Sequence, residues 1–63
     1  MMIAKKNDKL IRDGVRYCVI CADEEYFIIG QMEGDVTYFT QLEAYSNIKS
    51  INTLEQLNFI KED

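Results

Sequence analysis

The 63-residue sequence contains no histidine, no proline and no tryptophan, and it has only two cysteines and three glycines. Without histidine, catalytic groups of the Ser-His or Cys-His kind are excluded. A structural zinc ion normally takes four ligands, which two cysteines alone do not supply. The sequence also lacks an apolar run of the roughly 18 residues that a membrane helix needs. We therefore expect a protein that is not an enzyme and that uses no cofactor and no metal.

The first residues, Met1–Asp8, do not show the order of a signal peptide, in which a basic region precedes an apolar stretch. This favours a cytoplasmic protein, whose two cysteines stay reduced. A chain of this length makes one small domain over residues 1–63 and buries only about 60% of its unfolded surface. Because such a core supplies roughly 3–5 kcal/mol, we expect oligomerisation to add stability.

Charge is unevenly distributed along the chain. The formal net charge is −4, which argues against general nucleic-acid binding, because Lys and Arg supply most of that affinity. Residues 1–16 carry five basic and two acidic side chains, whereas residues 17–63 carry two basic and nine acidic ones. The simplest interpretation is a solvated surface with a basic and an acidic edge. The sharper interpretation is an acidic face that meets a basic partner.

The first two thirds of the chain is rich in β-branched and aromatic residues that alternate with polar ones, which is typical of strands. Turn signals at Asp13-Gly14, Asp23-Glu24 and Glu33–Asp35 separate these segments. We predict a three- to four-stranded antiparallel β-meander with strands at Lys9–Arg12 (a short edge strand), Val15–Ala22, Glu25–Met32 and Val36–Thr40.

A two-residue turn at Asp23-Glu24 sets the register of the first long hairpin, with Val19 opposite Ile28 and Cys21 opposite Tyr26. Side chains of a strand alternate between faces, so both faces of this sheet become apolar. One face is predicted to carry Val15, Tyr17, Val19, Cys21, Tyr26, Ile28 and Met32, and the other Cys18, Ile20, Ala22, Phe27 and Ile29. Each face therefore needs a cover.

The last third of the chain has apolar residues at every third position, namely Leu42, Tyr45, Ile48, Ile51, Leu54, Leu57 and Ile60. One straight helix cannot keep this winding stripe in the core, since each step of three falls 60° short of a full turn. Helix-start signals at Thr40 and Asn52 predict one or two short helices packed on one sheet face: a helical turn or short helix within 41–49 and a helix within 53–61. The fold class is then α+β. The alternative is a final strand within Asn47–Ile51 or Phe59–Lys61 that closes a small SH3-like β-barrel.

Helices on one face leave the other face uncovered, and a large exposed apolar surface usually marks an interface. A two-fold homodimer is the commonest way to cover such a face. The spacing Cys18-Val19-Ile20-Cys21 resembles that of zinc and thiol redox sites. In a strand, however, positions three apart point to opposite faces, so we expect both cysteines to serve in packing.

Two groups of carboxylates lie in predicted turns at opposite ends of the middle strand, about 20 Å or more apart, so they cannot flank one substrate. We expect an acidic protein-binding module that modulates or inhibits a partner protein, and the composition suits a bacterial or phage genome. The expected partner-binding residues are Asp23, Glu24, Glu25, Glu33 and Asp35, with Tyr26 and Tyr38 beside them.

Two other functions remain open. An acidic nucleic-acid mimic that blocks a DNA-binding protein would lose affinity steeply with salt. A homo-oligomer that sequesters a nucleotide or another small molecule would be stabilised thermally by that ligand. Direct nucleic-acid binding by Lys5–Arg16 would need a dimer that brings two basic segments together.

Overall fold

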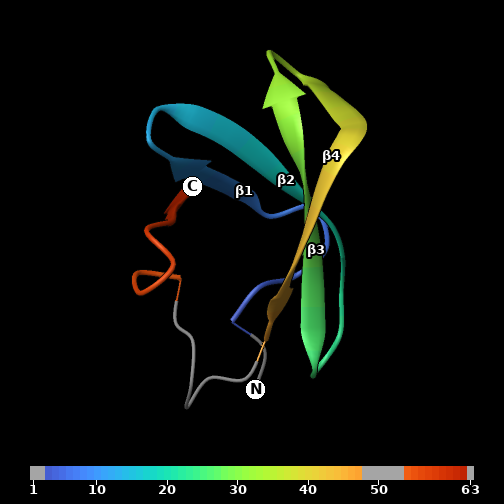
Figure 1. The fold of residues 1–63 in the computed structure, drawn as a ribbon, viewed down its shortest axis with the longest axis vertical. Helices are drawn as coiled ribbons and strands as arrows, with labels where there is room; N and C mark the ends of the chain where they lie inside the picture. Colours follow the sequence, from blue (N-terminus) through green and yellow to red (C-terminus); the bar gives the residue numbers. More distant parts are fainter. Residues whose placement is uncertain (1–2, 48–53, 63) are drawn as a thin grey trace.

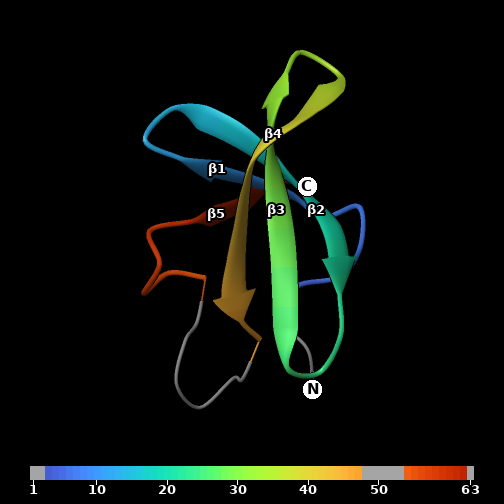
Figure 2. The ribbon, with the colours of Figure 1, turned by 45° about the vertical axis from the view of Figure 1, so that its right-hand side comes forward.

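A computed structural model describes residues 3–47 and 54–62, with residues 38–40 described for their backbone only. The described part folds as one antiparallel sheet in the order β4-β3-β2-β1-β5 (Figures 1 and 2). Its strands are β1 (Lys9–Arg12), β2 (Val15–Ala22), β3 (Tyr26–Glu33), β4 (Val36–Ser46) and β5 (Ile60–Glu62). The strands β1 and β2 lie where the sequence predicted them, although β1 is not an edge strand, because β5 pairs with its outer side.

Two tight turns lie where the sequence predicted them, and each connects the two strands of a hairpin. Between β1 and β2, Asp13 and Gly14 both have positive φ, 53° and 78°, as a type I′ turn requires. Between β3 and β4, Glu33 pairs with Val36, and Gly34 takes a φ of 62° at the first turn position. Aspartate and glycine tolerate these left-handed conformations at low steric cost, which is why both turns were recognisable in the sequence.

The connection between β2 and β3 differs from the prediction. Residues 23–25 lie between the two strands, and Ala22 pairs with Phe27, so that four residues separate this first pair and Cys21 pairs with Ile28. A β-bulge between Val19 and Cys21 then shifts the pairing by one residue, so that Val19 pairs with Ile29. The predicted register was therefore wrong. Next to the loop the partners move by two residues, which keeps side chains on the same face, whereas the extra residue at the bulge moves Val19 to the other face.

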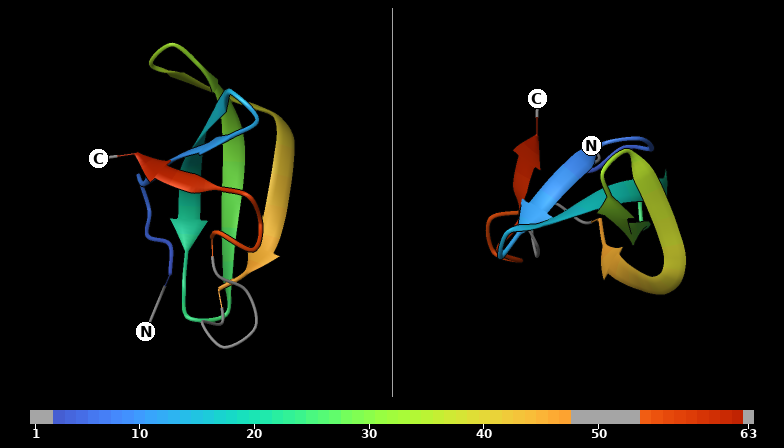
Figure 3. Two further views of the ribbon diagram at one scale, coloured as in Figure 1. Left: turned by 90° about the vertical axis from the view of Figure 1, so that its left-hand side faces the viewer. Right: turned by 90° about the horizontal axis from the view of Figure 1, so that it is seen from above.

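The hydrophobic core lies on the inner face of the curved sheet. Its buried members are Ala4, Leu10, Val19, Phe27, Ile29 and Phe59. The N-terminal segment supplies Ala4, and the segment before β5 supplies Phe59, so the two ends of the chain cover this face (Figure 3). Phe27 stacks on Tyr45 at 5.6 Å between ring centroids. Each fully buried aliphatic or aromatic side chain of this kind contributes about 1.5–3 kcal/mol.

The two predicted C-terminal helices were wrong, and with them the α+β class, because the described residues contain only strands, turns and loops. Residues 41–46 continue β4, and residues 54–58 form turns, with the amide of Phe59 bonded to the carbonyl of Leu54 at 2.8 Å. Residues 48–53, which include the end of the first predicted helix and the start of the second, lie outside the described residues. The three-residue spacing combined strand residues with turn residues, so it was not a helical period.

The described residues do not form the alternative, a closed barrel, either. A final strand does occur, at Ile60–Glu62, and it pairs with β1. However, β4 and β5 are the two ends of the strand order, so the described sheet stays open.

One arginine ties the inner face together. The guanidinium of Arg12 lies 4.5 Å from the ring centroid of Phe59 and 5.2 Å from that of Tyr17. It donates hydrogen bonds of 2.8 Å to the hydroxyl of Tyr45 and to the carboxylate of Glu43. The bonds to Tyr45 and Tyr17, followed by that to Glu43, raise the Arg12 pKa above its already high value. Arg12 is thus a permanently charged structural link between β1, β4 and the segment before β5.

Candidate partner-binding surface

The structure brings together only some of the predicted site residues. Asp23, Glu24 and Glu25 form the exposed loop between β2 and β3, and Tyr26 follows them at the start of β3. Glu33 and Asp35 are also exposed, but they lie at the other end of the eight-residue strand β3. At about 3.3 Å per residue these two groups are roughly 25 Å apart. Tyr38 belongs to β4, and its side chain lies outside the description.

The loop of residues 23–25, called the acidic loop below, is held in one conformation by Asp23. Its carboxylate accepts hydrogen bonds of 2.8 Å from the backbone amides of Glu25 and Tyr26. The amide of Asp23 in turn donates to the carbonyl of Tyr26 at 2.9 Å. The bonds from Tyr26 and then Glu25 lower the pKa of Asp23, because they stabilise the ionised form. An aspartate that bonds to the backbone two residues on is a common way to fix a turn.

A second support comes from Asn47, a fully buried residue at the end of β4. Its side-chain oxygen accepts from the amides of Ile3 and Ala4 at 3.0 and 3.1 Å. Its side-chain nitrogen donates to the carbonyls of Ala4 and Asp23 at 3.2 and 2.7 Å. Its own backbone amide donates to the carbonyl of Glu25 at 2.7 Å. Asn47 therefore anchors the acidic loop to the N-terminal segment and to β4.

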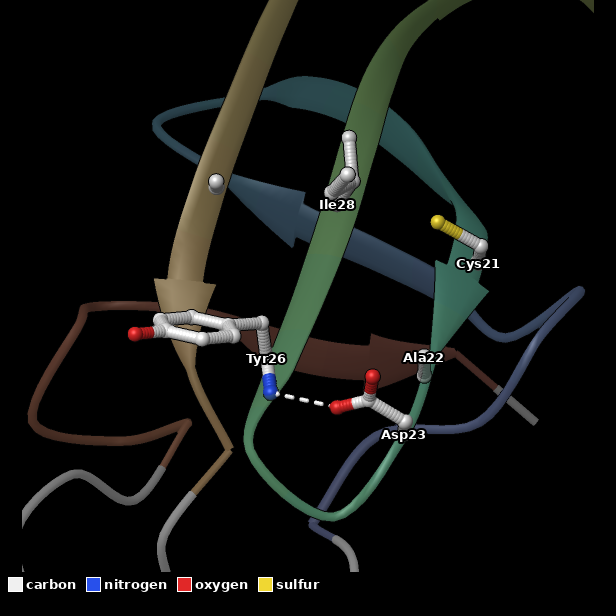
Figure 4. Close-up of a pocket in the computed structure, with 6 residues that line it drawn as sticks. Cys21, Ala22, Asp23, Tyr26 and Ile28 are labelled. Carbon is white, nitrogen blue, oxygen red and sulfur yellow. Dashed lines mark hydrogen bonds between the residues drawn. The ribbon is translucent and has the colours of Figure 1, made fainter.

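An open cleft with a volume of about 300 Å³ lies beside the acidic loop, on the outer face of the sheet. Figure 4 shows Cys21, Ile28 and Tyr26 around it, with Asp23 at its rim. Its full lining is Cys21, Ala22, Asp23, Tyr26, Ile28 and Ala44. The side chain of Tyr26 is 57% exposed. The bulge puts Cys21, Tyr26 and Ile28 on the face opposite Val19, whereas the predicted register placed them on one face with this buried residue.

The acidic loop keeps its negative charge available. The described ion pairs join Arg12 to Glu43, Arg16 to Glu62 and Lys61 to Asp8. None of these pairs involves the acidic loop, so within the described residues its three carboxylates have no cationic partner. The result is a fixed acidic group directly beside an apolar cleft.

The two cysteines lie on the same face of the sheet, not on opposite faces as predicted. Cys18 pairs with Gly30 and Cys21 with Ile28, and these partners are two residues apart on β3. The intervening bulge at Ile20 causes the difference. Both cysteines are free thiols, Cys18 buried and Cys21 exposed. Across residues 3–47 and 54–62, no group of three or more possible metal ligands is present.

Sequence reasoning missed Asn47 and the role of Ile28. Asn47 carries no recognisable motif, because its partners lie up to 44 residues away in the chain. A bulge is likewise set by how the hairpin packs and not by a local signal at Ile20. The prediction of a polar turn at Asp23-Glu24 did, however, lead to the acidic loop.

Comparisons with models of protein families, with curated proteins and with solved structures find no match. In the described part of the chain, no helix has the length and apolar character needed to cross a membrane.

Proposed function

We propose that this protein is a small, non-enzymatic, acidic binding module that modulates a partner protein by covering part of its surface. The contact surface is the acidic loop together with the apolar cleft beside it. The observation that carries the proposal is the position of Tyr26, which is 57% exposed between a braced group of carboxylates and an apolar cleft.

Each part of this surface suits a role in association. Tyrosine supplies a large contact area at low entropic cost and is enriched among the residues that dominate binding energy. The carboxylates of Glu24 and Glu25 favour a partner with a basic surface, since complementary charge speeds association and selects orientation. The bonds from Asp23 and Asn47 order the loop before binding, which reduces the entropy lost on association.

Glu33 and Asp35 are not part of the proposed surface, because they lie at the far end of β3. Their part in binding, which the sequence led us to expect, stays a prediction. Their distance from the acidic loop makes them an internal control for the loss of negative charge. The homodimer expected from the sequence also stays a prediction, since the exposed apolar cleft is open to a second copy as well.

The experiment first identifies the partner and then measures how substitutions in the proposed surface change its affinity. A photo-crosslinking amino acid in place of Tyr26 captures proteins that contact the cleft, and one captured protein is purified. Its affinity is then measured for the wild type and for the double variant Glu24→Lys/Glu25→Lys. The matched control is Glu33→Lys/Asp35→Lys, which changes the net charge equally at the other end of β3.

We expect the loop variant to lose at least about tenfold in affinity, or about 1.4 kcal/mol, and the control to change by less than about threefold. Equal losses in both variants, with a steep dependence on salt, would instead support the nucleic-acid mimic. A captured protein whose affinity neither variant changes would contradict the proposed surface.

A further inference from the structure

The strand β4 is one edge of the described sheet, and its hydrogen-bonding pattern shows which backbone groups face outward. The amide of Asn47 bonds to the carbonyl of Glu25, which marks that pair as hydrogen bonded. Antiparallel pairs alternate, so the pair Phe27 with Tyr45 is also hydrogen bonded, whereas the pair Ile28 with Ala44 is not. The backbone N–H and C=O groups of Ala44, and by the same alternation those of Leu42, point away from β3 to the open edge.

This edge has little of the usual protection against a further strand. Natural edge strands are commonly blocked by lysine, proline or inward-pointing charge. Residues 42–46 contain neither lysine nor proline, and their one charged side chain, Glu43, points to the inner face, where the cation of Arg12 pairs with it. The register shift between Gly30 and Gln31 bends β4 just before this stretch, so the regular edge begins at Leu42. Within the described residues, only β3 pairs with β4.

The side chains at this edge continue the cleft. Ala44 lines it directly, opposite Ile28, and Leu42 lies two residues further along the same face with 54% of its surface exposed. The acidic loop lies at the other end of the stretch, next to the pair Tyr26 with Ser46. An added strand would therefore meet backbone groups, apolar side chains and carboxylates in one line.

We propose that the partner contributes an extended segment that pairs with the edge of β4 as an additional strand. Its backbone bonds to the outward groups of Leu42 and Ala44, its apolar side chains pack on the cleft, and a lysine or arginine meets the acidic loop. This mode of recognition combines backbone hydrogen bonds for affinity with side-chain pockets for specificity. The inference rests on the proposed function and specifies the form of the partner.

Charge favours a foreign segment over a second copy of this chain. Residues 36–46, which make up β4, contain no lysine and no arginine. Two copies joined edge to edge through β4 would bring no cation from that strand to either acidic loop. They would also bring together two chains that each carry a net charge of −4. A basic segment of another protein supplies a cation to the acidic loop and avoids the repulsion between two chains of net negative charge.

The test uses a blocked synthetic peptide of about ten residues with alternating lysine and valine, a length that spans an ordinary strand. Amide hydrogen exchange is followed by NMR with and without the peptide. We expect saturating peptide to slow exchange of the Leu42 and Ala44 amides by at least about tenfold, because binding supplies them with acceptors. The amides of Glu43 and Tyr45, which already point to β3, should change little.

Two N-methylated peptides of the same charge are the matched controls. Methylation of the alternate amides that face β4 should abolish binding, whereas methylation of the other set should preserve it. Equal binding of all three peptides would show attraction by charge alone, which overturns strand pairing but leaves the proposed function standing. Absence of binding at about 1 mM peptide, which corresponds to a binding free energy weaker than about 4 kcal/mol, would also overturn strand pairing.

A variant tests the same edge from the protein side. Ala44→Pro removes an outward N–H that makes no hydrogen bond to β3. Proline is tolerated in edge strands at positions of this kind. We expect this variant to keep the native circular dichroism and to lose at least about tenfold in peptide affinity, whereas Ala44→Val keeps it. If the proline variant does not fold, the comparison of the two N-methylated peptides still tests strand pairing. Protection of the Leu42 and Ala44 amides in a peptide-free dimer would assign the edge to a second copy and overturn the proposal.

Discussion

The side-chain nitrogen of Asn47 donates a 2.7 Å hydrogen bond to the backbone carbonyl of Asp23, which joins the end of β4 to the start of the acidic loop. The rest of the same amide group is bonded to the backbone of Ile3 and Ala4. Three segments that are distant in the sequence thus meet at one buried side chain. Such a fully satisfied buried amide both stabilises a fold and specifies its geometry.

Replacement of Asn47 should be among the most damaging substitutions outside the hydrophobic core. Asn47→Ala leaves two amides and two carbonyls without their partner, and each buried unsatisfied group costs about 1–3 kcal/mol. Because some of these groups regain water, we expect a net loss of about 2–4 kcal/mol in the free energy of unfolding. Urea denaturation measures it, with the exposed Glu55→Ala as a control that should change by less than about 0.5 kcal/mol. A similar small change for both variants would contradict the anchoring role of Asn47.

Two adjacent isoleucines on β3 should respond in opposite ways to a charge. Ile29 is fully buried in the core, whereas Ile28 is half-buried in the cleft on the outer face. Ile29→Asp buries an unpaired carboxylate and should unfold the protein. Ile28→Asp leaves its carboxylate at the solvent-facing surface and should keep the fold. Far-UV circular dichroism and thermal melting distinguish the outcomes, and unfolding of both variants would favour the register expected from the sequence.

The parts of the fold that were predictable have local causes. The pair Asp13-Gly14 and the glycine at position 34 mark turns because few other residues adopt positive φ. The alternation in Val15–Ala22 marked β2 correctly. Recognition of these turns and strands needs only neighbours in the sequence.

The parts that were not predictable depend on distant contacts. The bulge at Ile20 puts Val19 in the core and leaves Cys21 and Ile28 on the outer face, and this changes which side chains surround the cleft. The final strand at Ile60–Glu62, which was predicted only as an alternative near Phe59–Lys61, pairs with β1, and its three residues carry little local signal of their own. The acidic loop of the candidate surface was predicted from composition, but its apolar half was not, since its members come from β2, β3 and β4.

Arg12 should be hard to replace by lysine, although the charge is conserved. Its planar guanidinium lies over Phe59 and bonds to Tyr45 and Glu43 at once, which a single ammonium group cannot reproduce. We expect Arg12→Lys to lower the free energy of unfolding by about 1–2 kcal/mol, from a weaker cation–π contact and one lost hydrogen bond. The comparison is Lys6→Arg, which makes the reverse exchange at an exposed position and should be neutral. An Arg12→Lys variant as stable as the wild type would show that charge alone holds this link.

The stability of the protein should depend on the ionisation of Asp23 at acid pH. The amides of Tyr26 and Glu25 lower its pKa in the folded state below the value of an unfolded aspartate, about 3.9. Its contribution is therefore fully present above that unfolded value and is lost as the pH falls through the lower, folded value. In Asp23→Asn the side-chain oxygen still accepts hydrogen bonds but does not titrate, so the stability advantage of the wild type over this variant should shrink below about pH 4. Urea denaturation across this pH range, with NMR titration of the Asp23 carboxyl carbon, measures both quantities. Glu24→Gln removes the same charge from the same loop without touching these hydrogen bonds, so identical pH profiles for the two variants would contradict the assigned cause.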